Sequence, residues 1–214
     1  MYISARNYPE PKLSQFLFAS RRMAPVWTVV RLYLGYLWLK DGLLKVQSPL
    51  WVGPEAGAVT TSLLTRSLTL TAGEHPSVPL WYAWVIEHMF LPNALLFSNL
   101  LAVGAVLIGL ALICGFLTGI TAFIAGSLNA SYLMAGIVFS GPTMFILATW
   151  LVLAWRVAGY YGLDYWLLPK LGAPRGEAFD QEAASQEADQ GLPGRRPERE
   201  LLRFDRPLDR SKTA

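Results

Sequence analysis

Four ionisable side chains lie inside one hydrophobic segment, Val26 to Val46; they are Arg31, Lys40, Asp41 and Lys45. Ionisable groups are costly in a segment that crosses a membrane, so they mark candidate functional positions. The two lysines offer positive charge and Asp41 offers a proton acceptor. Such a set is suited to binding a small anion or the headgroup of a quinone. The alternative is that Arg31 and Lys45 extend to the membrane surfaces while Asp41 and Lys45 simply pair.

The spacing of these residues predicts one packed helix face. Arg31, Trp38 and Lys45 recur at intervals of seven residues, and Gly35 and Gly42 lie close to the same face. A helix turns about 100° per residue, so these positions fall within about 40° of one another. Glycine on such a face lets a neighbouring helix approach closely. We therefore expect Arg31 and Lys45 near the two membrane surfaces, on a face that packs against another helix.

Three further polar residues are candidates for ligand contacts. Glu87 and His88 are adjacent, and a histidine beside a carboxylate can relay protons for quinone chemistry. On a helix, however, neighbours point about 100° apart, and interfacial polar residues without a special role are common. Asn129 lies at the centre of a predicted helix. Its amide is suited either to a hydrogen bond between helices or to holding a ligand carbonyl.

The elements that must position these residues are hydrophobic helices. Residues 91–160 are almost uninterruptedly apolar, with Arg156 as the only charged side chain. A membrane-spanning helix needs roughly 20 apolar residues, so this stretch is long enough for three spans. We predict helices from Asn93 to Cys114, from a turn at 115–118 to about Phe139, and from a turn at 140–142 to about Tyr160. Together with Val26–Val46, they predict an all-α integral membrane protein, a four-transmembrane-helix bundle.

The charge distribution predicts that both termini are cytoplasmic. Residues 1–23 carry four basic residues against one acidic residue, and an excess of Lys and Arg stays on the cytoplasmic side. The long segment 47–90, between helices 1 and 2, is then external, and its aromatic end at 78–90 predicts an interfacial helix. The expected organisation is a cytoplasmic segment 1–23, a four-helix transmembrane domain 24–172, and a charged, flexible cytoplasmic tail 173–214.

Composition excludes several kinds of cofactor and partner. Cys114 is the only cysteine, and His75 and His88 are the only histidines. An internal disulfide, a cysteine-ligated iron–sulfur cluster and a bis-histidine haem are therefore impossible within this chain, and no metal site is expected. A net charge of +3 without a basic, aromatic patch gives no sign of nucleic-acid binding. Electron transfer would need a dissociable carrier such as a quinone, or a partner's cofactor.

Four segments together resemble the DoxX/DoxD family of small four-helix membrane proteins. They are RLYLGYLWLKDGLLKV (31–46), the glycine-spaced second helix, LNASYLMAG (128–136) and GYYGLDYWLLPKLG (159–172). The most specific features are Gly162 and Asp164 in the last segment, followed by the pattern Arg31, Gly35, Gly42 and Lys45. The resemblance implies a multi-pass protein of a prokaryotic plasma membrane. Its DoxD members imply a subunit of a thiosulfate:quinone oxidoreductase, which oxidises thiosulfate to tetrathionate and passes electrons to quinone with a second subunit.

Two functions of different classes follow from these features. The first is a quinone-interacting membrane subunit of an oxidoreductase for a small sulfur compound, in a hetero-oligomer with another membrane or membrane-associated redox subunit. The second is a non-catalytic anchor or assembly subunit of a larger membrane complex, docked through the tail and the external segment. A small-solute carrier is disfavoured, because only one span is rich in charge and no repeated half is visible. The sequence assigns no catalytic residue.

Overall fold

The computed structural model of the chain describes residues 11–18, 20–72, 75–138 and 141–171, and all regular structure in these ranges is helical. The described helices belong to the first of the two units into which the chain divides, residues 1–176. The predicted tail 173–214 and half of the N-terminal segment lie outside the described residues. The helices are α1 (Lys12–Phe18), η1 (Arg21–Met23), α2 (Ala24–Val46), α3 (Ala58–Thr69), α4 (Leu80–Val85), the π-helical turn η2 (Ile86–Phe90), α5 (Ala94–Cys114), α6 (Thr118–Met134), α7 (Gly141–Leu153), α8 (Trp155–Ala158), α9 (Asp164–Leu167) and η3 (Leu168–Leu171).

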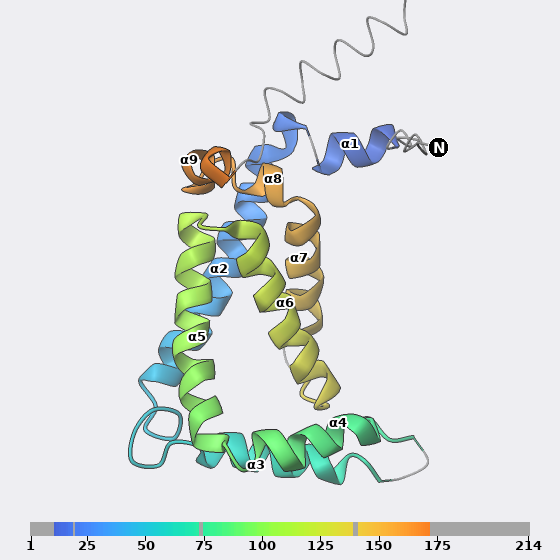
Figure 1. Cartoon of the computed structure of the whole chain (residues 1–214), viewed down its shortest axis with the longest axis vertical. Coiled ribbons are helices and arrows are strands. Elements are labelled where there is room, and N and C mark those ends of the chain that lie inside the picture. The colour runs from blue at the N-terminus through green and yellow to red at the C-terminus, as the bar shows by residue number, and fades with distance from the viewer. Residues whose placement is uncertain (1–10, 19, 73–74, 139–140, 172–214) are drawn as a thin grey trace, which may run out of the picture. The chain divides into compact units, whose positions relative to one another are not determined.

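The four long helices form two pairs. Helix α2 packs along α5, and α6 packs along α7. In Figure 1, α5 and α6 meet at their connecting turn and diverge from it, so that the two pairs separate toward α3 and α4. The core between the pairs is filled by large side chains of α2, such as Leu34 and Trp38, and by alanines of α6 and α7, such as Ala125 and Ala148.

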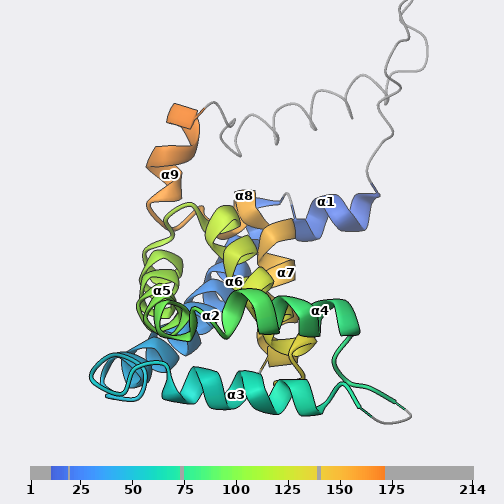
Figure 2. The ribbon, with the colours of Figure 1, turned by 60° about the horizontal axis from the view of Figure 1, so that its bottom comes forward.

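Helices α3 and α4 cross the end of the bundle at which the two pairs separate (Figures 1 and 2). Leu64 of α3 and Tyr82 and Ile86 of the α4 region pack in a second apolar cluster with Ala135, which follows α6. The helix predicted at 78–90 is present as α4 and η2. Helix α3 was not predicted, because its sequence, AVTTSLLTRSLT, is rich in residues that do not favour an isolated helix. The described parts of the segment, residues 47–72 and 75–90, therefore form a folded cover over one end of the bundle.

Two predicted helices end earlier than expected. The helix predicted to reach Phe139 ends at Met134, because Gly136 adopts a left-handed conformation with φ of 71°. The helix predicted to continue to Tyr160 is interrupted at Ala154, so that α7 and the short α8 replace it. Length and apolar composition together mark one of the described helices, α5, as a candidate membrane span. Helix α2 is longer, but it contains the four charged residues.

Close backbone contact between α2 and α5 depends on glycine. A Cβ atom on Gly42 would lie 2.5 Å from the Val106 backbone nitrogen, and one on Gly109 would lie 2.5 Å from the Leu39 backbone nitrogen. Real Cβ atoms do not approach so closely, so any side chain at these positions must push the two helices apart. The glycine spacing read from the sequence therefore corresponds to a helix interface, as expected for Gly42.

This interface predicts a contrast between two glycines of α5. Gly109→Ala is expected to destabilise the protein by about 1–3 kcal/mol, because the helices must separate. Gly104→Ala is the matched control, because a Cβ there meets no atom within 4 Å. It should be neutral or slightly stabilising, since alanine favours the helix. Thermal unfolding of the two purified variants in one detergent measures the difference, and equal midpoints would contradict the close packing.

Candidate functional site

A cavity of about 690 Å³ lies between α2, α3, α6 and α7, where the two helix pairs separate. We call it the polar chamber. It is lined from α2 by Leu37, Trp38, Lys40, Asp41, Leu44 and Lys45, from the following connection by Ser48 and Trp51, and from α3 by Val59 and Leu63; the other side is formed by Asn129, Tyr132, Ile137, Gly141 and Met144. Most of this lining is apolar, and the polar groups are concentrated on α2 and α6. Ligand sites commonly have this composition.

Lys45 is the charged centre of the polar chamber. Its Nζ lies 2.6 Å from Oδ2 of Asp41, one helical turn earlier. The same ammonium lies 4.8 Å from the ring centroid of Trp51 and 5.7 Å from that of Tyr132. The side chain of Lys45 is only 14% exposed, whereas that of Asp41 is 49% exposed. One cation is thus held between a carboxylate open to solvent and two aromatic faces.

Helix α6 supplies an amide and a phenol to the same chamber. Asn129 is buried, and its Nδ2 donates to the Ala125 carbonyl at 3.1 Å, within α6. Tyr132 follows Asn129 by three residues, so both lie on one face of the helix. Trp38 lies opposite on α2; its indole nitrogen is buried and has no hydrogen-bond partner within the described ranges. Two roles are expected for Asn129, a hydrogen bond between helices and a contact with a ligand. Its amide nitrogen bonds within its own helix, and its side chain lines the chamber.

A second cavity of about 180 Å³ adjoins the first beneath α3 and α4. We call it the apolar chamber, because Leu64, Phe90, Phe97, Leu101, Leu128 and Ala135 provide much of its lining. Trp51, Leu63, Tyr132 and Ile137 line both cavities. At its edge the Tyr82 hydroxyl donates to the Ser131 carbonyl at 2.9 Å. Burial raises the pKa of Tyr82, which keeps the hydroxyl protonated as a donor.

Arg31 lies at the opposite end of the bundle and binds backbone carbonyls. Its Nη1 donates to Leu112 O at 2.5 Å and to Ile113 O at 3.2 Å, and its Nη2 donates to Tyr161 O at 3.1 Å. The first two carbonyls belong to the last turn of α5, which carries the negative end of the helix dipole. Arg31 is 1% exposed. It therefore ties α2 to the end of α5 and does not line the polar chamber.

At the same end of the bundle, Asp164 binds the backbone amides at the start of α6. Its Oδ1 accepts from Leu117 N at 2.6 Å and its Oδ2 accepts from Thr118 N at 2.8 Å. These are the first amides of α6, so the carboxylate caps that helix at its positive end. Leu117 has a φ of 45°, which is strained for a residue with a Cβ, and the bond that its N–H donates to Asp164 supports this conformation. We call Arg31, Asp164 and the turn between α5 and α6 the end clamp.

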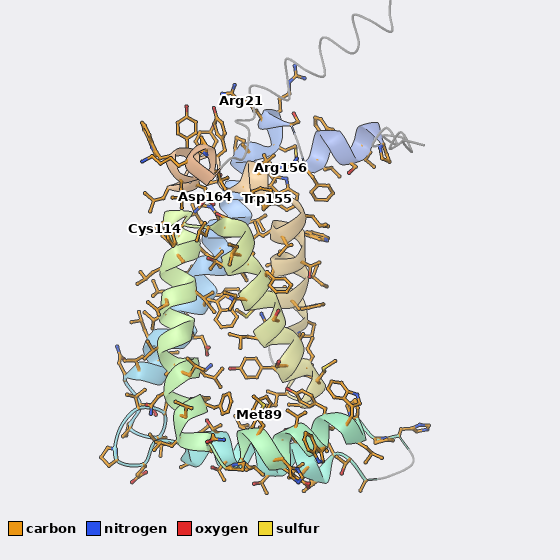
Figure 3. The ribbon with its side chains drawn as sticks, in the orientation of Figure 1. Arg21, Met89, Cys114, Trp155, Arg156 and Asp164 are labelled. Atoms are coloured by element: carbon orange, nitrogen blue, oxygen red, sulfur yellow. The ribbon has the colours of Figure 1, made fainter. Side chains whose placement is uncertain are left out.

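Glycines make the end clamp possible. The Cα of Gly115 would lie 2.9 Å from a Cβ on Gly162, and a Cβ on Gly115 would collide with the Arg31 guanidinium. A Cβ on Gly159 would lie 2.6 Å from Asp164 Oδ2. Backbone bonds from Leu163 N to Cys114 O and from Asp164 N to Gly115 O join the same segments. The motif residues Gly162 and Asp164, and the motif residue Arg31, thus meet in one structural junction (Figure 3 labels Asp164 and Cys114).

Glu87 and His88 are exposed in η2 and line neither chamber. The His88 ring stacks on Trp84 at 4.8 Å between centroids, and its Nδ1 lies 2.9 Å from the Trp84 carbonyl oxygen. η2 closes with a bond from Leu91 N to Ile86 O. Such π turns are frequent at functional sites, but neither side chain is placed beside Lys45. Within the described residues, no group of three His, Cys, Asp or Glu side chains is arranged to hold a metal ion.

The structure brings together four of the seven candidate ligand residues. Lys40, Asp41, Lys45 and Asn129 line the polar chamber, whereas the other three lie elsewhere. Sequence reasoning missed Tyr132, although its spacing from Asn129 on one helix face was a usable signal. It also missed Trp51, whose place beside Lys45 depends on the path of the connection after α2. No spacing in the sequence predicts that contact.

The end clamp predicts that its two charged residues act on stability. Asp164→Asn places an amide donor against the amides of Leu117 and Thr118. Arg31→Lys loses the guanidinium fork, whose two nitrogens reach three carbonyls. Each change should lower the unfolding free energy by about 1–3 kcal/mol, measured by thermal unfolding in detergent. Arg66→Lys, on the exposed surface of α3, is the matched control and should have no measurable effect. Unchanged midpoints in the clamp variants would show that these bonds do not hold the fold.

Comparisons of the chain with family models, with curated proteins and with solved structures found no match. They therefore assign neither a family nor a fold relative to this chain. The resemblance to the DoxX/DoxD family remains an expectation from the motifs of the sequence, and what it implies for activity enters only as a proposal.

Proposed function

We propose that the chain is the membrane subunit of a quinone-linked oxidoreductase that acts on a small sulfur compound such as thiosulfate, together with a partner redox subunit. The observation that carries this proposal is the polar chamber, in which Lys45, Asp41 and Asn129 line a cavity that is otherwise largely apolar. A quinone needs an apolar slot for its ring and a few polar groups for its carbonyls. The chamber offers both.

A membrane position agrees with the surfaces of the long helices. Large apolar side chains are exposed on all four of them, and examples are Val29, Leu32, Leu96, Leu100, Leu107, Ile120, Phe123, Ile146, Trp150 and Leu153. Apolar exposure on this scale is typical of contact with lipid. Helices α2 and α5, with 23 and 21 residues, are about 30 Å or more in length, which matches the hydrocarbon core of a bilayer. We propose that α2, α5, α6 and α7 with α8 are four spans.

The orientation is proposed from the basic residues. Arg21 and Arg156 lie at the end of the bundle that carries Asp164, and Met89 lies at the other end (Figure 3). Positive charge is retained on the cytoplasmic side, so the end clamp faces the cytoplasm and the cover formed by α3 and α4 faces outward. In this orientation the polar chamber is near the outer surface of the plasma membrane. A substrate anion would reach it without crossing the bilayer.

The chemistry of the proposed reaction balances over two electrons. Two thiosulfate ions form one S–S bond in tetrathionate and release two electrons, and a quinone takes up these electrons and two protons to become a quinol. The positive charges of Lys40 and Lys45 attract the anion. Asp41, half exposed and bonded to Lys45, connects the chamber with solvent protons. The quinone carries the electrons, while this chain's side chains bind, orient and exchange protons.

The proposal predicts a loss of turnover when the Lys45–Asp41 pair is changed. Lys45→Met keeps the length of the side chain and removes its charge, and Asp41→Asn removes the proton acceptor. Each should lower thiosulfate-dependent quinol formation by about tenfold or more in membranes that contain the full complex. Lys170→Met, an exposed lysine of η3, is the matched control and should retain the rate.

Co-purification of the partner subunit distinguishes lost chemistry from lost assembly. The proposal requires that the Lys45 and Asp41 variants still bind the partner. If both variants retain full activity, the polar chamber is not the site of the reaction. If wild-type membranes form no quinol from thiosulfate and the chain is recovered within a complex whose redox groups all reside elsewhere, the chain is an anchor or assembly subunit.

A further inference from the structure

We propose that the apolar chamber holds the first isoprenoid unit of the quinone tail, next to a ring bound in the polar chamber; this rests on the quinone site proposed above. The protein would then select quinones by their tail and not by the ring alone. The inference assigns a ligand to the second cavity, which the oxidoreductase reaction itself does not require. It depends on the position, the size and the lining of that cavity.

The two chambers are neighbours with a common wall. Trp51 and Tyr132 are the aromatic part of this wall, and Leu63 and Ile137 are its aliphatic part. Beyond the wall the lining changes from charged groups to leucine, phenylalanine and alanine side chains. An occupant that extends from one chamber to the other therefore has a polar end and an apolar end. A quinone ring with its tail has this order of groups.

The size of the apolar chamber sets how much of the tail it accepts. A cavity of roughly 150 Å³ lined by apolar side chains holds a benzene-sized molecule. The apolar chamber, at about 180 Å³, therefore has room for the five carbons of one isoprenoid unit but not for a long chain. The rest of the tail would leave the bundle and extend into the lipid.

Tyr132 lies between the polar chamber and the apolar chamber. Its ring is part of the wall on both sides and lies below the Lys45 ammonium. A tail that enters the apolar chamber must turn this ring aside, which weakens its contact with Lys45. If the carbonyl of a bound quinone accepts a hydrogen bond from Lys45, that bond replaces the contact that the ammonium loses with the Tyr132 ring. Ring binding and tail entry thus support each other through one residue.

Thr60 provides a clean way to test the apolar chamber. It lies on α3 and lines the apolar chamber but not the polar chamber. Its buried hydroxyl has no hydrogen-bond partner within the described residues. Thr60→Phe fills the chamber from α3, and Thr60→Val is the matched control, because valine removes the hydroxyl without filling the space. Ala135→Leu, on the opposite wall, fills the chamber from another element. It keeps the test decisive if Thr60→Phe does not fold.

The experiment measures binding of three ligands to the full chain in nanodiscs, by quenching of tryptophan fluorescence. The ligands are the ubiquinone ring without a tail, with one isoprenoid unit and with two. In the wild type and in Thr60→Val, the first unit should increase affinity about tenfold or more. In Thr60→Phe or Ala135→Leu most of this gain should disappear. Binding of the ring alone should stay unchanged, and partition of each ligand into the lipid is the same for every variant.

The possible results separate this inference from the proposed function. If the ring binds but the filling variants retain the full gain from the first unit, the tail lies elsewhere and the inference is overturned, while the quinone site stands. If filling the chamber lowers the affinity for the ring alone as strongly as the affinity for the tailed ligands, the chamber does not act as a tail site. If none of the three ligands binds to the wild type, the quinone site and the inference both fall.

Discussion

The end clamp is the interaction on which the rest of the described structure depends. Arg31 binds the last carbonyls of α5, and Asp164 binds the first amides of α6, so one turn of chain is held by opposite charges on its two sides. Each charge faces the helix end of opposite polarity, which makes the arrangement favourable even where water is excluded. With the helix pairs tied at this end, they can diverge at the other end without coming apart. The polar chamber occupies the space that this divergence opens.

Helices α3 and α4 cover the gap that opens where the two helix pairs diverge. Side chains facing the gap between the two pairs have no partner helix at that level, so an uncovered gap would expose them. The second apolar cluster, with Leu64, Tyr82 and Ala135, packs across the end of the bundle, next to the polar and apolar chambers. The cover is also why a charged residue such as Lys45 is only slightly exposed. A partly buried cation then requires the carboxylate and aromatic partners that surround it.

Much of the fold was predictable from hydrophobic length, and the part that was not depends on distant contacts. The starts of α2 and α5 lie within two residues of their predicted positions, because apolar runs and proline or asparagine mark them. The charges of Lys40, Asp41 and Lys45 marked the part of α2 that lines the polar chamber. The sequence did not reveal that Arg31 bonds carbonyls 81 and more residues away, since backbone groups leave no signature in the side-chain pattern. Trp51 and α3 were missed for a similar reason: their places are set by the cover that they form.

One helix carries both the clamp and the charged centre of the chamber, and this joins stability to binding. Arg31 and Lys45 are fourteen residues apart on one face of α2, or roughly 20 Å along a helix axis. Gly35 and Gly42 lie between them and bring the backbone of α2 into close contact with α5, which fixes this part of α2 on α5. Movement needed to admit a ligand must therefore come from the α6–α7 pair or from the cover. Tyr132 belongs to the α6–α7 pair, and Trp51 leads into the cover. The two rings that contact Lys45 therefore lie on the parts whose movement would admit a ligand.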